Sequence, residues 1–405
     1  MPDGSIAVTA KFGRKRDTIV AAATELLNRE GVKGMTLAKV AERVGLITTS
    51  VTYYFKKKED LAAACFLRGI ERIETVVAEA QAGGSPEARL EILLDRYLAL
   101  KGRVLSGQEP PIPVFSDIRA LTDEPHRQVL EAYLRLFRAV RELLRGTPDH
   151  AGLHGTAFTQ MVLEQLHWLQ AWLHRYPEAE FGEVRARMHD ILLRGLGAPG
   201  QAWSPRPLDP AAIHPAEGGQ RETFLLAATR LINQQGYRGA SVDKISASLN
   251  VTKGSFYHHH SAKDDVVVSC FSRSFQVVRA AQDAALALPD ADAWTRLSSA
   301  AAALMGFQLS PHGPLLRTSA LSALPEGMRV EMVAQSNRLS ERWAAMIADG
   351  AAEGSLRPVD PFIAAQMFNA GLNASSDLPV LLGGVTAHQL VDLYARPMLT
   401  GLQPA

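Results

Sequence analysis

The sequence predicts an all-helical protein built from two tandem copies of one unit of about 200 residues. Three observations lead to this prediction. Ala, Leu and Arg are abundant while aromatic residues make up 7% of the chain, a composition that favours helices. The length of 405 residues exceeds that of one ordinary domain. The chain also matches itself when it is shifted by 205 residues.

The internal repeat aligns a segment near the start of the chain with a segment near its middle. Residues 16–68 match residues 221–273 without gaps, and 16 of the 53 positions are identical. The two cysteines, Cys65 and Cys270, fall at the same offset. A long period with two copies indicates a duplicated domain and not a solenoid. We therefore expect both cysteines to be buried at equivalent places and not to form a disulfide.

A proline-rich stretch separates the two copies. Residues 195–219 contain five prolines, which interrupt helices and favour extended chain. Such a linker allows either close docking or separation of the halves. The expected domains are two helix-turn-helix heads at 11–60 and 219–265, two helical bodies at 61–198 and 266–405, and a linker at 199–218.

The charge of the chain is concentrated in the two heads. Residues 11–58 carry a net charge of +7 and residues 219–263 carry +4, so the remainder carries −10 in a chain of net charge +1. Basic segments on an acidic body are typical of DNA-binding heads attached to a body with another role. The alternative is a solvated basic surface that binds nothing.

The first basic segment has the pattern of a helix-turn-helix. Apolar residues at helical spacing predict a helix over residues 17–30, which Gly31 and Gly34 end. Thr36 can cap a second helix, and Gly45 supplies the positive φ of a tight turn. A third helix is expected from about Thr48 to Phe55 and a fourth from Lys58. The second copy repeats this plan at 224–235, 241–249, 253–260 and 263 onward.

This motif resembles the TetR family of bacterial transcriptional regulators. The second copy fits through Val251-Thr252-Lys253-Gly254-Ser255-Phe256-Tyr257-His258-His259-His260, followed by Lys263-Asp264-Asp265. The first copy fits through Leu46-Ile47-Thr48-Thr49-Ser50-Val51-Thr52-Tyr53-Tyr54-Phe55, followed by Lys58-Glu59-Asp60-Leu61. Beyond the heads, the resemblance rests on helical bodies of suitable length.

The resemblance implies which side chains would bind double-stranded DNA. The third helix of each head would enter the major groove and face base edges. An aromatic position on that helix, the lysine that opens the fourth helix and the cap of the second helix would contact phosphates. The expected DNA-binding residues are Thr36, Thr48, Thr49, Ser50, Thr52, Tyr53, Tyr54 and Lys58 in the first copy, and Ser241, Lys253, Gly254, Ser255, Tyr257, His258, His259 and Lys263 in the second.

Two positions depart from the family pattern. Thr52 replaces an aromatic residue of the third helix, so the first head is expected to hold DNA less firmly. His260 stands where the first copy has Phe55, a residue expected to anchor this helix on the core. His260 either loosens the second head and makes it sensitive to pH or lies half-exposed without special effect, and we favour the second interpretation.

Each head is followed by a helical body. Helices are expected near 86–105, 123–145, 152–175 and 178–196, and near 292–309, 315–323, 326–352, 359–375 and 386–400. A stripe of Met161, Gln165, Trp168 and Trp172 follows helical spacing. The resemblance implies a ligand pocket in the body and a dimer interface made by its last two helices. The stripe fits plain core, such an interface or ligand contact, and these four residues are our candidate ligand-binding residues.

Several function classes find no support in the sequence. No nucleotide-binding, hydrolase or metalloprotease motif occurs, so we expect no enzyme, no catalytic residue and no cofactor. Three consecutive histidines at 258–260 point about 100° apart on a helix and cannot share one metal ion. The absence of an apolar run of 18 residues or of a secretory signal, together with only two cysteines, predicts a cytoplasmic protein without a membrane span.

The predicted function is a ligand-responsive transcriptional repressor. The two halves would form an intramolecular pseudo-dimer that reads an asymmetric operator, because the two heads carry different reading residues. The expected effector is a small apolar or aromatic molecule, and further pairing of whole chains stays open. The alternative is a helical module that binds small molecules or proteins and in which only one head still binds DNA.

Overall fold

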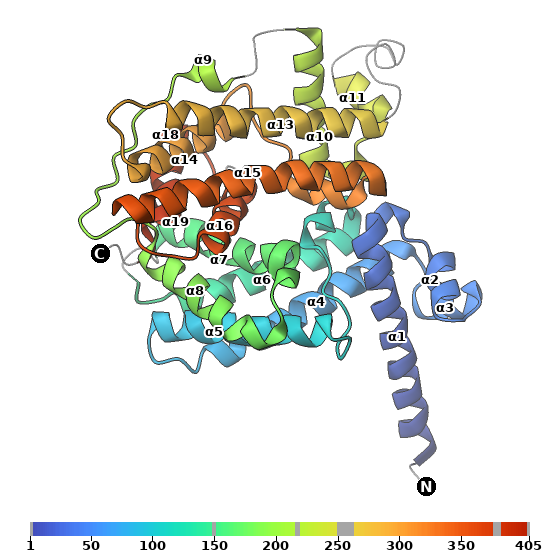
Figure 1. Cartoon of the computed structure of the whole chain (residues 1–405). Helices are drawn as coiled ribbons and strands as arrows, with labels where there is room; N and C mark the ends of the chain where they lie inside the picture. The colour runs from blue at the N-terminus through green and yellow to red at the C-terminus, as the bar shows by residue number, and fades with distance from the viewer. Residues whose placement is uncertain (1–2, 148–150, 215–218, 249–262, 376–381, 403–405) are drawn as a thin grey trace.

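The computed structural model describes residues 3–147, 151–214, 219–248, 263–375 and 382–402. Within these residues the secondary structure consists of helices and two isolated β-bridges, so the chain has the all-α fold that the sequence predicts. Figure 1 shows the helices of the first half (blue to green) lying beside those of the second half (yellow to red). In the described part of the chain, no helix combines the length and apolar character needed to cross a membrane.

The first half begins with a long helix, α1, that extends away from the body (Figure 1). It starts before the predicted residue 17, because residues 5–16 contain no proline and only one glycine to interrupt it. Gly31 breaks it with a φ of 66°, as predicted. The helices are α1 (Asp3–Gly34), α2 (Leu37–Arg43), α3 (Thr48–Tyr54), α4 (Lys58–Ala80), α5 (Pro86–Leu105), the 3-10 helix η1 (Phe115–Ala120), α6 (Asp123–Leu143), α7 (Gly152–Trp172), the 3-10 helices η2 (Leu173–Arg175) and η3 (Glu178–Glu180), and α8 (Phe181–Arg194).

The second half repeats this order with local changes. A short helix α9 (Pro210–Ile213) lies in the linker, and the predicted helix at 253–260 falls outside the described residues. The last segment is split by a π-helical turn. The helices are α10 (Gln220–Gly239), α11 (Val242–Ser248), α13 (Lys263–Leu286), α14 (Ala293–Leu309), the 3-10 helix η4 (Thr318–Ala323), α15 (Glu326–Glu353), α16 (Pro361–Ala374), α18 (Ala387–Leu390), the π-helical turn η6 (Val391–Ala395) and α19 (Arg396–Thr400).

The duplication extends to individual hydrogen bonds. Cys65 Sγ donates to the carbonyl of Val20 at 3.6 Å, and Cys270 Sγ donates to the carbonyl of Leu225 at 3.5 Å. Both pairs are related by the 205-residue offset, and both cysteines are buried and free. Burial raises the pKa of Cys65 to about 11 and that of Cys270 to about 12. The prediction of two buried, equivalent thiols is confirmed.

The two halves pack on each other through their last helices. α7 of the first half contacts α16 and η6 of the second, and α8 also contacts α16. Gln165 lies in this contact and donates from Nε2 to the carbonyl of Met367 at 2.9 Å. One apolar core runs through the first head and both bodies, whereas the second head, α13 and η4 share a smaller core with Met332 of α15. The second head therefore has an apolar core distinct from that of the rest of the chain.

The linker is docked along the second body. The indole of Trp203 lies 6.3 Å from that of Trp294, whose Nε1 donates to the carbonyl of Ala202 at 2.9 Å. The backbone N of Arg206 donates to Ser299 Oγ at 2.8 Å. Since both backbone and side chains are engaged, residues 202–206 are held against α14 instead of spanning open solvent.

Candidate nucleic-acid interface and central cavity

The turn between α2 and α3 holds the third helix of the first head in place. Thr36 caps α2, with its hydroxyl accepting from Lys39 N at 3.2 Å, and Gly45 adopts a φ of 66°. Val51 is fully buried and anchors α3 on the core. The opposite face of α3 therefore points away from the core.

The outward face of α3 is polar and accessible. Thr48 and Thr49 are exposed, and the side chain of Tyr53 is 69% exposed, which is unusual for so large an apolar ring. Ser50 and Thr52 are half-buried, and Thr52 Oγ1 donates to the carbonyl of Thr49 at 2.9 Å within the same helix. Thr48, Thr49 and Tyr53 are thus the side chains of α3 that are most accessible for contact with DNA bases.

The expected phosphate-binding side chains lie at the edge of this face. Tyr54 is half-buried, with its ring centroid 4.6 Å from that of Phe12 on α1. Lys58 Nζ donates to the carbonyl of Lys33 at 3.3 Å. The ammonium of Lys58 therefore lies where the long helix α4 begins, close to the end of α1.

The second head is described up to the end of α11 and again from α13. Ser241 caps α11 as Thr36 caps α2, with its hydroxyl accepting from Lys244 N at 3.2 Å. The ammonium of Lys263 lies 4.2 Å from the centroid of the Tyr237 ring. The other expected contacts of this head lie outside the described residues; they are Lys253, Gly254, Ser255, Tyr257, His258 and His259.

The two heads touch each other, which the sequence did not indicate. α1 contacts α10, and Lys33 Nζ lies 3.8 Å from the position that a Cβ would take on Gly239. Partial burial lowers the pKa of Lys33, and the charges of Lys244 and Lys58 lower it further. Lysines of both heads thus converge on one basic region, a feature suited to a phosphate backbone.

A cavity of about 1160 Å³ lies between the two halves. It is lined by η1, α6 and α7 of the first half and by α10, η4, α15 and α16 of the second. Trp168 and Trp172 line it, whereas Gln165 and Met161 are buried and are not among its lining residues. Trp168 Nε1 donates to Gln366 Oε1 at 3.1 Å, so this indole also links the two halves.

Charged side chains lie deep in this cavity. Glu164 of α7 accepts from Asn373 Nδ2 of α16 at 2.9 Å, and Arg119 donates to the carbonyl of Asn233 at 2.9 Å. Burial raises the pKa of Glu164. Burial, followed by repulsion from Arg119, lowers the pKa of Arg317 to about 9. The sequence reasoning missed these residues because they come from separate helices and no spacing relates them.

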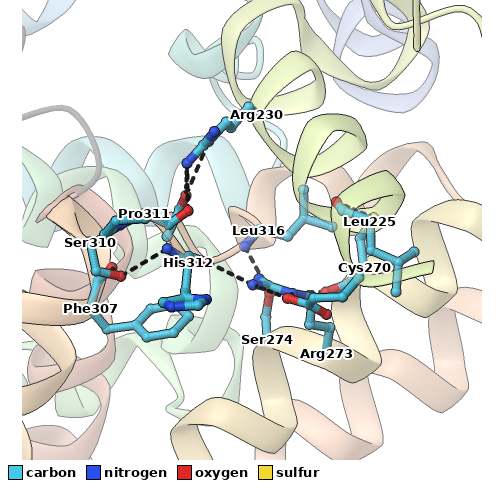
Figure 2. Close-up of polar contacts among 12 residues, drawn as sticks. Leu225, Arg230, Cys270, Arg273, Ser274, Phe307, Ser310, Pro311, His312 and Leu316 are labelled. Carbon is cyan, nitrogen blue, oxygen red and sulfur yellow. Dashed lines mark hydrogen bonds and ion pairs between the residues drawn. The ribbon is translucent and has the colours of Figure 1, made fainter. Parts of the chain in front are cut away.

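The turn over residues 310–316 joins the cavity to the second head (Figure 2). Arg230 of α10 donates to the carbonyls of Pro311 at 2.8 Å and Gly313 at 3.0 Å. Arg273 of α13 donates to the carbonyl of His312 at 2.6 Å. Arg230 also lines the cavity. Its side chain therefore connects the cavity with both the turn and the second head.

The first head has the helix-turn-helix arrangement of α2, a tight turn and α3, and α10 and α11 repeat the first two helices of this head. The family model for the N-terminal domain of the TetR family of bacterial regulatory proteins matches residues 19–65 and again residues 224–270. Both heads are thus TetR-type N-terminal domains, and the tandem, duplicated form that the sequence predicts is confirmed.

Curated relatives match over limited segments. The transposon Tn10 TetC protein of Escherichia coli is 32% identical over 68 residues, covering 15% of this chain and 34% of that protein. An uncharacterized helix-turn-helix regulator in the dhlA 5′ region of Xanthobacter autotrophicus is 35% identical over 91 residues, covering 22% of this chain and 45% of that protein. The chain therefore matches less than half the length of either relative.

Solved structures of TetR-family regulators align over less than half of this chain. The regulator PfmR from Thermus thermophilus is 22% identical and aligns over 44% of this chain and 98% of its own length, with a TM-score of 0.37.

Proposed function

We propose that the chain is a ligand-responsive DNA-binding transcriptional repressor whose two halves act as the two subunits of a pseudo-dimer. The observation that carries the proposal is the direct contact of the two heads within one chain, with lysines of both heads around Lys33. The accessible polar face of α3 supplies the base-reading surface of the first head. One chain would then present both heads to adjacent half-sites.

The operator of such a protein would be asymmetric. In a DNA-binding pseudo-dimer, the half-sites lie about one helical turn, roughly 34–36 Å, apart. The reading positions Thr48, Thr49, Thr52 and Tyr53 of the first head correspond to Lys253, Gly254, Tyr257 and His258 of the second. Because their hydrogen-bonding groups differ, each head would favour a different base sequence.

A small effector in the central cavity would control DNA binding. The cavity carries an aromatic lining that includes Trp168 and Trp172, which suits an apolar or aromatic molecule. Such a molecule can change DNA affinity only by binding one arrangement of the heads more tightly than another. The contacts that the cavity shares with the second head provide a physical route for this difference.

A second candidate function is a helical effector-binding module in which one head no longer reads DNA. Two observations favour it: the second head has an apolar core of its own, and Thr52 Oγ1 is bound within α3. Weak binding that ignores DNA sequence would support this function over the first.

The experiment is fluorescence-anisotropy binding of the full chain to a fragment of its own upstream DNA, against random DNA. Two double variants are compared with wild type, Thr52→Ala with Tyr53→Ala and Tyr257→Ala with His258→Ala. The repressor proposal expects both variants to lose specific binding by about 5-fold or more, since a good base contact contributes about 1–3 kcal/mol.

Loss in one variant only would favour the single-head module. A wild-type chain without preference over random DNA would refute the repressor proposal and favour the effector-binding module. Light scattering completes the test, because a tight dimer of chains that pairs like halves with like halves would contradict the pseudo-dimer.

A further inference from the structure

We propose that the cavity between the halves is a single effector site per chain and that its ligand is an anionic amphipathic molecule. The ligand would carry an acidic group such as a carboxylate on a hydrophobic body. The inference rests on the proposed function only where it calls the bound molecule an effector. It narrows the ligand class from apolar or aromatic molecules to those that also carry an acidic group.

The lining of the cavity carries more basic than acidic side chains. The chain as a whole has nearly equal numbers of basic and acidic residues, 43 against 42. Glu164 is the one acidic side chain among the described residues that line the cavity. Five arginines line it: Arg119, Arg175, Arg230, Arg317 and Arg329. A cavity with this excess of guanidinium groups attracts an anion and disfavours a cation.

The innermost charged side chains of the cavity are at least half-buried. The side chain of Arg317 is buried, and Glu164 and Arg119 are half-buried close to it. Arg119 and Arg317 already have partners, yet guanidinium groups outnumber the carboxylate of Glu164 in the lining, and charge is costly in such a poorly solvated place. An anionic group that entered here would reduce this cost and form charge-assisted hydrogen bonds. A neutral ligand of the same shape would do neither.

The two halves of the chain differ at the position of Arg317. Asn28 and Asn233 are equivalent at the 205-residue offset. Asn28 Oδ1 accepts from the backbone N of Val114 at 2.9 Å, and Asn233 Oδ1 accepts from the backbone N of Arg317 at 3.1 Å. Arg317 therefore occupies the position of Val114 in the other half. The duplication does not repeat this cationic group, so the chain offers one such site and not two.

Part of the cavity lining is apolar and accessible to solvent. Leu130 and Leu134 of α6 and Val333 of α15 line the cavity, yet their side chains are 40%, 40% and 38% exposed. Accessible apolar side chains around a cavity mark a place where a hydrophobic ligand is covered. Because α6 and α15 belong to different halves, a hydrophobic body here would contact both.

The site is also placed to influence the second head. Arg317 directly follows the turn at 310–316, which binds Arg230 of α10 and Arg273 of α13 (Figure 2). A ligand that engaged Arg317 would favour one position of this turn over another. The second head, which has its own core, would follow the turn more readily than the first head.

The test is isothermal titration calorimetry of the full chain, without DNA, against two matched pairs of probes. Decanoate is compared with decanol, and 2-naphthoate with 2-naphthol, with tryptophan fluorescence as a second readout because Trp168 and Trp172 line the cavity. We expect at least one anion to bind at one equivalent per chain, tenfold or more tighter than its neutral partner.

Two variants locate the acidic group. Arg317→Met should abolish the preference for the anion, while Arg342→Met should keep it. Arg342 is a partly buried arginine of α15 that does not line the cavity and bonds Gln282 Oε1 at 3.0 Å. If circular dichroism shows that Arg317→Met does not fold, the anion preference and the stoichiometry of the wild-type chain still test the inference.

The inference would be overturned by any of three results: equal affinity for the anion and its neutral partner in both pairs, a stoichiometry of two equivalents per chain, or no binding of either anion. A chain that binds one anion but no specific DNA would contradict the proposed function and leave this site standing. The two failures are therefore distinguishable.

Discussion

His167 gives the structure a specific sensitivity to acid. Its ring lies on α7 beside the rings of Phe115, at 5.2 Å, and Tyr133, at 6.4 Å. Its Nε2 atom is buried and has no hydrogen-bond partner among the described residues. Burial, with a smaller contribution from Lys101, lowers the pKa of His167 to about 4 from the usual 6.5. The folded chain therefore keeps this imidazole neutral at pH values where the unfolded chain protonates it.

The resulting loss of stability can be worked out from the two pKa values. Because the pKa of His167 is lower in the folded chain than in the unfolded chain, the free energy of unfolding is at its full value above pH 6.5. It decreases as the pH falls from 6.5 toward 4. Between pH 7.5 and pH 5, linkage gives a loss of about 2 kcal/mol in the free energy of unfolding from this one group. His167→Phe removes the titration and keeps an aromatic ring of similar shape beside Phe115.

The assay is urea unfolding at pH 7.5 and at pH 5, followed by circular dichroism. Wild type should lose about 2 kcal/mol more than His167→Phe between the two pH values. His388→Gln serves as the control, because the side chain of His388 is 90% exposed, and it should behave as wild type does. If wild type and His167→Phe lose the same stability, the argument from burial of His167 is wrong.

Three further predictions follow from local structure. Gly45→Ala should lower the free energy of unfolding by about 1–2 kcal/mol because a side chain is strained at positive φ, and it should also weaken DNA binding. Gly107→Ala is the control: Gly107 also has a positive φ with open space around it, so the melting temperature should fall similarly while DNA affinity stays unchanged. Arg230→Gln removes the bonds to the turn at 310–316, so hydrogen exchange should quicken in α10 and stay unchanged in α1; equal rates in α10 would contradict the coupling. Trp203→Ala should speed hydrogen exchange of the Arg206 amide, followed by mass spectrometry, because the docked indole helps to keep this amide bonded to Ser299 Oγ; unchanged exchange would show that the indole does not hold the linker.

Local features of the chain were predictable because they depend on neighbours in sequence. The break of α1 at Gly31, the cap at Thr36 and the positive φ of Gly45 all follow from backbone rules that act over a few residues. The burial of Cys65 and Cys270 followed from the repeat, since equivalent positions of a duplicated domain face equivalent cores.

Other features depend on contacts between residues far apart in the chain. The α1 helix is longer than predicted because no residue stops it, although its first turns show no apolar pattern that would reveal it. Of the stripe on α7, Trp168 and Trp172 line the cavity, whereas Gln165 bonds α16. Helical spacing places all these side chains on one face and cannot say which part of that face meets another helix.

The sequence by itself determined that the protein is helical, that it is duplicated and that each copy opens with a helix-turn-helix, because periodicity, caps and glycines act locally. Tertiary structure alone decided that the heads meet at Lys33 and that Arg119, Glu164 and Arg317 share one cavity. The physical reason is that the pairing of the halves brings together residues that are separated by up to about 200 positions in the sequence. The two copies can also share one fold while carrying different side chains where they meet.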